Sequence, residues 1–341
     1  MTTPVTIESK GSDFAQLTRK IQDAGLLERR PVYYALRGTL LGLAFFGGWG
    51  LFLWVGDSWL QLLVAAFLAI VFAQAGLYAH DLAHRQIFKK RPASDVVGRL
   101  VGNLGIGLGY GWWNDKHTRH HANPNHEEHD PDVSPAVLVW SDNQASKAKG
   151  LPLFMARWQA YLFFPLLTLE GWHLHVASVK SVLKPGVVKR RGLEAALLAA
   201  HFVIYFGIVF ATLPFGMAIV FLLVHQGLFG IYLGCTFAPN HKGMPVLSGD
   251  DKLDFLRKQV LTSRNVRGGW FINTALGGLN FQIEHHLFPN MPTPNLRLAQ
   301  PIVREHCEKL GVDYLESGLI SSYSQAIRHL YSVGEALRVK A

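Results

Sequence analysis

The chain has 341 residues, of which 49% are apolar, with a mean hydropathy of +0.16 and a formal net charge of +9. This composition favours a membrane protein over a soluble one, and the positive charge forms no single stripe of the kind that nucleic-acid-binding proteins carry. With two cysteines and no CxxC pair, the sequence has no disulfide framework, zinc ribbon or iron–sulfur carrier.

Residues 1–31 are polar and predict a solvated N-terminal arm. Two apolar stretches follow, at about 33–55 and 58–79, and two more lie at about 193–213 and 215–238. Each has roughly the 20 residues that a membrane-spanning helix needs. Short links at Gly56-Asp57 and Pro214 make each pair a hairpin. No Lys or Arg occurs in residues 38–79 or 192–241. Both termini and all cations therefore lie on one side, the cytoplasm by the positive-inside rule.

Three histidine motifs stand outside these apolar stretches or at their ends. HDLAH (residues 80–84) places two imidazoles at i and i+4, and HTRHH (117–121) places three at i, i+3 and i+4. QIEHH (282–286) repeats the second spacing with glutamine at its first position. On a helix such positions share one face, and imidazole is a favoured ligand of iron, zinc and copper. The sequence therefore predicts a histidine-rich metal centre.

His241 follows the fourth apolar stretch as HDLAH follows the second, so it is an eighth histidine candidate. The candidate metal ligands are His80, His84, His117, His120, His121, His241, His285 and His286, with Gln282 as a weaker one. We expect Asp81, Asp130 and Asp132 to hold ligating rings in orientation, and Asn240 or Asn280 to hold a metal-bound water. HExxH is absent, which disfavours a zincin-type protease.

Other histidines have more ordinary interpretations. We expect His126 and His129 to be polar loop residues and His175 to be structural. His201 and His225 lie within the second hairpin, where interhelical hydrogen bonding is the simpler interpretation. The alternative is ligation of a transmembrane haem in an electron-transfer protein.

Two further segments need an interpretation. The glycine-rich run at 102–111 does not satisfy GxGxxG, so it predicts close helix packing or a bend rather than a dinucleotide site. Residues 152–172 are apolar but contain Arg157, Glu170 and Pro165. They predict an interfacial amphipathic helix or shallow hairpin. A true span here would place QIEHH on the opposite side of the membrane from HTRHH.

The three motifs, in this order at helix ends, resemble those of the membrane fatty acid desaturase family. Residues 270–290 (WFINTALGGLNFQIEHHLFPN), with glutamine opening the last histidine motif, are similar to the front-end desaturases of the delta-5 and delta-6 type. HHANPNHEEHDPD (120–132) is similar to the same group. The resemblance covers about residues 33–314. It implies a desaturase domain at 32–314, followed by a helical cytoplasmic tail at 315–341.

The resemblance also implies an all-α integral membrane fold, with four transmembrane helices in two hairpins under a cytoplasmic cap. The cap would hold two iron ions on the eight histidines, with O2 as co-substrate. No HPGG haem-binding motif occurs, so a fused cytochrome domain is not expected and electrons would come from a ferredoxin-type donor with its reductase. A bacterial plasma membrane is the expected location.

The activity implied is insertion of a cis double bond into a long acyl chain, carried by coenzyme A or by a membrane lipid. Hydrogen removal from an unactivated methylene needs a metal–oxygen oxidant, and the protein must hold the acyl chain against it. Trp112, Trp113 and Trp270 are candidates for lining an apolar substrate tunnel. The alternative is a fatty acyl or lipid hydroxylase or ketolase on the same scaffold.

Overall fold

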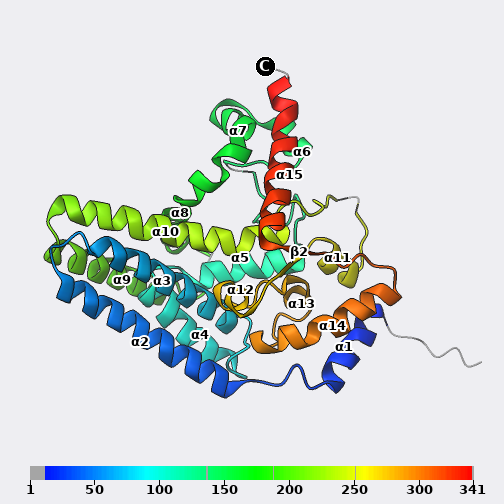
Figure 1. Cartoon of the computed structure of the whole chain (residues 1–341), viewed down its shortest axis with the longest axis horizontal. Coiled ribbons are helices and arrows are strands. Elements are labelled where there is room, and N and C mark those ends of the chain that lie inside the picture. The colour runs from blue at the N-terminus through cyan, green and yellow to red at the C-terminus, as the bar shows by residue number, and fades with distance from the viewer. Residues whose placement is uncertain (1–11, 136, 187, 250, 340–341) are drawn as a thin grey trace, which may run out of the picture.

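The computed structural model describes residues 12–339 except 136, 187 and 250, so residues 1–11 of the predicted arm lie outside the described part. The described chain is helical apart from two strands of three residues each (Figure 1). The expected all-helical fold with four long apolar helices is confirmed.

Four helices are long and apolar enough to cross a membrane: α2 (Pro31–Val55), α3 (Gln61–Ala83), α9 (Arg191–Thr212) and α10 (Phe215–His241). Pro31 suits the first turn of α2, where its missing N–H costs nothing. Gly56, with φ of +59°, ends that helix. The Gln61 side chain then donates to the carbonyls of Phe52 and Gly56, which closes the hairpin turn.

Aromatic residues hold the two hairpins together. Phe52 of α2 meets Phe221 of α10 edge to face, and Phe72 of α3 meets Phe229 of α10 in the same way. Such pairs stabilise packing where lipid removes the ordinary hydrophobic driving force between helices. The four helices run side by side, with both hairpin turns at the same end of the bundle (Figure 1).

The two histidines inside the spans form hydrogen bonds to protein groups. His225 accepts from the Tyr205 hydroxyl across the α9–α10 hairpin at 2.7 Å, and His201 donates to the Leu104 carbonyl at 2.9 Å. His201 also stacks on the Tyr205 ring. These contacts match the interhelical hydrogen-bonding interpretation rather than haem ligation.

Between the hairpins lie α4 (Arg91–Arg99), the π-helix η1 (Leu100–Gly105), α5 (Tyr110–Ala122), α6 (Asp142–Lys147), α7 (Gly150–Leu167) and α8 (Glu170–Leu183). The glycine-rich run forms a bend. A Cβ on Gly98 would come within 2.3 Å of the Tyr110 ring, and Gly107, with φ of +70°, lies against His201 and His175. His175 itself contacts the carbonyls of Gly171 and Ile106, which makes it structural.

The segment at 152–172 forms nearly all of α7 and the start of α8. Neither helix qualifies as a span among the described residues. On α7, Leu151, Phe154 and Tyr161 are exposed, whereas Ala156 and Phe163 are buried on the side that packs against α15. The exposed side of α7 is apolar as well, so the expected amphipathic pattern is not found, and a location at the membrane interface stays a prediction.

The remaining elements form a cap at the end of the bundle opposite the hairpin turns (Figure 1). They are α1 (Asp13–Asp23), α11 (Phe255–Leu261), β1 (Asn265–Arg267), α12 (Trp270–Ala275), α13 (Gln282–Leu287), α14 (Thr293–Lys309), β2 (Glu316–Gly318) and α15 (Leu319–Val339). The strands β1 and β2 pair in parallel, with Asn265 opposite Glu316.

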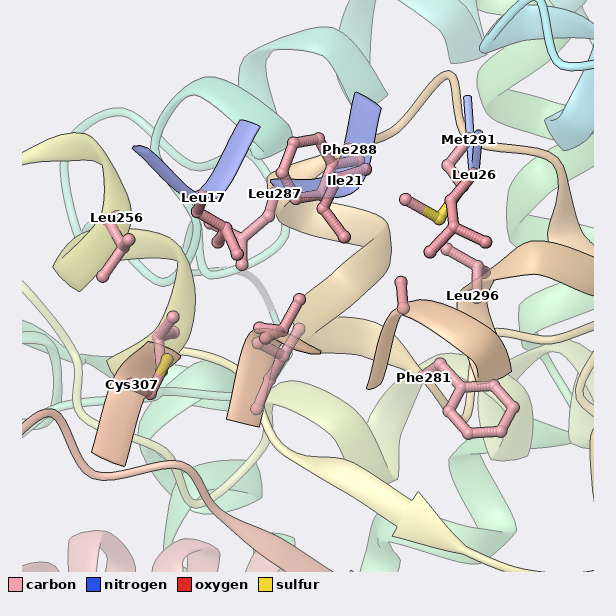
Figure 2. Packing of buried hydrophobic residues seen from close by; sticks show 14 of the residues in the cluster. Leu17, Ile21, Leu26, Leu256, Phe281, Leu287, Phe288, Met291, Leu296 and Cys307 are labelled. Atoms are coloured by element: carbon pink, nitrogen blue, oxygen red, sulfur yellow. The ribbon is translucent and has the colours of Figure 1, made fainter. Parts of the chain in front are cut away.

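A hydrophobic core fixes α13 within this cap (Figure 2). Ile283 and Leu287 of α13 pack with Leu17 and Ile21 of α1 and with residues of α11 and α14. Because one side of this short helix is anchored in the core, its two histidines are held in place on the other side. The core therefore positions the last histidine motif.

Candidate metal centre

The fold brings all eight predicted histidines together from four helix ends. His80 lies in the last turn of α3 and His84 directly follows that helix, while His241 is the last residue of α10. The other five come from α5 and α13. Segments separated by up to 206 positions in the sequence therefore meet at one place.

The first group, which we name the five-histidine cluster, contains His80, His84, His117, His121 and His285. One ring nitrogen of each lies within 4.8 Å of those of the others. His117 Nε2 is 2.9 Å from His84 Nε2 and 3.0 Å from His121 Nε2. Among described residues, both ring nitrogens of His285 and Nε2 of His80 are buried without a hydrogen-bond partner. Buried unpaired nitrogens are costly, and a bound metal ion would satisfy them.

The second group, the three-histidine cluster, contains His120, His241 and His286. Gln282 donates from Nε2 to Nε2 of His241 at 2.9 Å, so the glutamine joins this cluster. Nε2 of His286 is buried without a partner in the described chain. The two clusters adjoin, since the rings of His121 and His286 stack with centroids 4.3 Å apart. The arrangement fits two metal ions held side by side.

A second set of groups fixes the rings of the three-histidine cluster. His120 Nδ1 donates to Asp130 Oδ2 at 2.9 Å, and His286 Nδ1 donates to Gln259 Oε1 at 2.9 Å. His241 Nδ1 donates to the Thr262 carbonyl at 3.0 Å. Each bond places the ring proton on Nδ1, which leaves the Nε2 lone pairs of His120 and His286 for a metal, whereas Nε2 of His241 accepts from Gln282 and would be freed by a turn of that amide.

Asp130 is held in turn by its own neighbours. Its carboxylate accepts from the backbone N–H groups of Asn125 and Asp132, both at 2.8 Å. Burial alone would raise the pKa of Asp130, but the hydrogen bond and charge of His120, together with the backbone N–H of Asp132, lower it below its usual value. Asp132 pairs with Lys116, and this cation and His120 hold the pKa of the Asp132 carboxyl well below its usual range despite burial. Both carboxylates therefore stay ionised.

Four of the clustered histidines are neutral at physiological pH. Burial lowers the pKa of His117, His121, His285 and His286 well below the usual range, and the neighbouring imidazoles lower it further. A neutral imidazole offers a lone pair, so a metal ion need not displace a proton.

Comparison with known proteins decides the family. The fatty acid desaturase family model matches residues 57–318. The chain belongs to the fatty acid desaturase family. Membership makes it an oxidoreductase, and its histidine clusters are consistent with a dimetal site of the desaturase type.

Similar proteins include desaturases from a moss, a nematode and man. The chain is 29% identical over 336 residues to the acyl-lipid (9-3)-desaturase of Physcomitrium patens, covering 95% of this chain and 63% of that protein. It is 28% identical over 349 residues to the delta(6)-fatty-acid desaturase fat-3 of Caenorhabditis elegans, covering 96% and 76%. It is 31% identical over 336 residues to fatty acid desaturase 3 of Homo sapiens, covering 95% and 73%.

The other predicted residues of this desaturase-family chain lie at varied distances from the clusters. Asp81 accepts from His80 Nδ1 at 3.3 Å and pairs with Arg37 at 2.6 Å. Asn240 donates to Gln282 Oε1 at 3.3 Å. Asn280 instead bonds Asn273 and the Val266 carbonyl, so its side chain ties α12 to β1.

The three tryptophans differ in their surroundings. Trp113 stacks on His117 with centroids 4.4 Å apart, which places it against the five-histidine cluster. Trp112 is half-buried. Trp270 is 79% exposed, and the tunnel role of the three tryptophans stays a prediction. The whole of α12 shares this exposure, since none of its residues is buried.

The structure places the two loop histidines outside both clusters. His126 pairs with Glu128 at 3.0 Å and stacks loosely on His129. Two groups beside the clusters, Gln259 and the Thr262 carbonyl, were not predicted. Both lie in or next to α11, and no histidine motif or local spacing marks that helix.

Proposed function

We propose that this chain is an O2-dependent di-iron acyl desaturase that introduces a cis double bond into a long acyl chain. The observation that carries the proposal is the pair of adjacent histidine clusters, with buried ring nitrogens that lack partners in the described chain. Imidazole suits iron, and family membership favours iron over zinc or copper here.

The proposed ligands are the eight histidines. The five-histidine cluster would hold one ion, and the three-histidine cluster with Gln282 would hold the other. Bound iron would supply, with O2 and two electrons, the oxidant needed to remove hydrogen from an unactivated methylene.

The protein's own residues orient and shield this centre. Asp130, Gln259 and the Thr262 carbonyl keep three rings in the tautomer that presents Nε2. Trp113 covers one face of His117 and keeps water from that side of the cluster. A preorganised dry site protects a reactive oxidant from side reactions.

The regiochemistry that we propose is of the front-end type, with the new double bond on the carboxyl side of an existing one. Support comes from the names of the similar moss and nematode proteins, an acyl-lipid (9-3)-desaturase and a delta(6)-fatty-acid desaturase. The substrate would be an acyl chain carried by coenzyme A or by a membrane lipid.

The proposed electron donor is a ferredoxin or similar carrier with its reductase. Support comes from the sequence, whose 341 residues include two cysteines and no CxxC pair. The metal centre would face the cytoplasm of a bacterial cell, because lysines and arginines are absent from residues 38–79 and 192–241 and gather at the end that carries the cap.

The test is a mass-spectrometric profile of host fatty-acid methyl esters, with and without this chain, beside a co-expressed ferredoxin and reductase. His120→Ala and His285→Ala serve as inactive controls. A new double bond, mapped by position and absent from both variants, supports the proposal. Hydroxylated chains would indicate the hydroxylase alternative. If no new product forms although the electron donor is shown to work, the proposed function is contradicted.

A further inference from the structure

The short helix α12 differs from the rest of the cap in how little of it is covered. It buries none of its residues, and Trp270 and Phe271 are 79% and 70% exposed. Residues 268–283 carry no charge, whereas Arg267 directly before them is an exposed cation. We name residues 267–275 the α12 flap.

The C-terminal end of the flap lies among the membrane-spanning helices. Gln74 of α3 donates from Nε2 to the carbonyls of Thr274 and Ala275, at 3.1 and 3.3 Å. Tyr232 of α10 donates from its hydroxyl to the Ala275 carbonyl at 2.8 Å, and Gln74 also donates to that hydroxyl at 2.7 Å. The membrane-spanning helices α3 and α10 therefore both bind the backbone at the end of α12.

The depth of these contacts follows from helix geometry. At 1.5 Å per residue, Gln74 lies about 20 Å from Gln61 at the hairpin-turn end of α3. Tyr232 lies about 26 Å from Phe215 at the corresponding end of α10. The hydrocarbon core of a bilayer is about 30 Å thick. The end of the flap therefore reaches hydrocarbon depth.

Backbone that leaves a helix at this depth must find partners in the protein, because lipid offers none. Gln74 and Tyr232 provide those partners for the last carbonyls of α12. At the other end of the flap, Arg267 beside Trp270 and Phe271 has the composition of a membrane-interface anchor. Aromatic rings favour the headgroup level, where a cation meets lipid phosphate.

The flap also adjoins the metal centre. Gln74 precedes His80 by about 9 Å along α3. Gly277, with φ of +59°, packs so closely on Leu77 that a Cβ there would come within 2.9 Å of its side chain. Asn273 within the flap accepts from Asn280, two residues before Gln282. The flap therefore lies between the bilayer and the two histidine clusters.

We propose that the α12 flap is seated in the lipid interface and admits the acyl chain of a membrane phospholipid to the metal centre. The proposal rests on the proposed desaturase function and narrows its substrate to lipid-linked chains. A phospholipid whose phosphate meets Arg267 has its acyl chain at the depth of Gln74. Gly268 and Gly269 open the flap and Gly277 and Gly278 follow it; the last two have φ of +59° and +82°, a conformation that lets the chain turn away from the spans.

The first experiment tests only whether the α12 flap lies in the lipid interface, and it needs no turnover. The full chain, with Cys235 and Cys307 replaced by alanine, carries a nitroxide at Phe271→Cys and is reconstituted in phosphatidylcholine nanodiscs. We expect relaxation by O2 and protection from a water-soluble nickel chelate. Phe255→Cys, at an exposed position of α11 in the cap, is the matched control and should show the reverse. Equal access of the nickel chelate to both sites would overturn the placement of the flap in the lipid interface.

The second experiment tests the substrate. Nanodiscs contain the same acyl chain either in phosphatidylcholine or as a coenzyme A thioester added from solution, with a working electron donor. We expect consumption of the phosphatidylcholine chain, a decrease of at least tenfold in Trp270→Glu with unchanged bound iron, and no decrease in Phe255→Glu.

The outcomes separate the two proposals. Turnover of the thioester alone, unaffected by Trp270→Glu, would overturn the entry route while the desaturase function stands. If neither chain is modified, the proposed function fails and the entry route fails with it. The nitroxide measurement decides in either case whether the flap lies in the lipid interface.

Discussion

Replacing Asp130 with asparagine should weaken one metal site and spare the other. The Asp130 carboxylate accepts three N–H groups, from His120 Nδ1 and from the backbones of Asn125 and Asp132. An asparagine amide has one oxygen, so its NH2 group must face at least one of these donors. Because His120 belongs to the three-histidine cluster, the effect should be confined to that ion.

The size of the effect follows from the lost bonds. If the amide oxygen stays near His120 and Asn125, the buried N–H of Asp132 loses its acceptor, at a cost of about 1–3 kcal/mol. If the amide turns over, His120 loses its orienting partner. Loss of such a partner lowers metal affinity about 10- to 100-fold, equivalent to about 1.4–2.7 kcal/mol.

The assay is iron content of the purified full chain, measured by mass spectrometry during titration with a chelator. Asp130→Asn should release one of two ions at a chelator concentration 10- to 100-fold lower than the wild type requires. Glu128→Gln is the matched control, since it removes a carboxylate paired with His126 in the same loop but outside both clusters. If Asp130→Asn retains both ions as tightly as the wild type, the orienting role is wrong. Iron loss in both variants would point to disturbance of the loop instead.

Three other changes test different parts of the molecule. His285→Ala should abolish turnover and lower bound iron, because one of its ring nitrogens belongs to the five-histidine cluster, whereas His126→Ala should leave both the iron content and the product profile unchanged. Arg264→Leu should lower the free energy of unfolding by about 3 kcal/mol in denaturant titrations, because the fully buried guanidinium donates to the Pro239 and Lys242 carbonyls at the end of α10. Burial raises the pKa of Glu284 from the usual 4.5 to about 7, so the folded state binds the proton more tightly. Glu284 should therefore contribute about 3 kcal/mol to the free energy of unfolding of metal-free protein at pH 4.5 and lose this contribution by pH 7, measured as the difference between the wild type and Glu284→Gln, which share the opposing titration of the buried histidines; a difference that stays constant with pH would contradict the assignment.

The histidine spacings predicted the candidate site well because they are local. Two imidazoles at i and i+4, or three at i, i+3 and i+4, share a helix face whatever surrounds them. His241 required one further step, the parallel with HDLAH at the end of a span. Gln259 and the Thr262 carbonyl have no comparable local pattern, since only the packing of α11 against α13 brings them to the rings.

The tryptophans show the opposite case. Trp113 and Trp270 are equally apolar in the sequence, yet one stacks on His117 and the other is exposed on α12. Burial depends on which elements pack nearby, which a single sequence does not state.

Hydropathy has a related limit at helix ends. The apolar stretch before HDLAH stops at Ala79, but α3 continues to Ala83 because backbone hydrogen bonding does not require apolar side chains.

The scattered origin of the metal ligands has a consequence for biogenesis. During synthesis, His80 and His84 are made with the first hairpin, His241 only at the end of the second, and His285 and His286 after both. The three-histidine cluster therefore cannot form until both hairpins are inserted and the cap has closed. Metal loading is then the last event of maturation, and a chain arrested at any earlier stage would remain without a complete ligand set. Retention of the proposed iron ions would thereby report that the whole membrane domain has assembled.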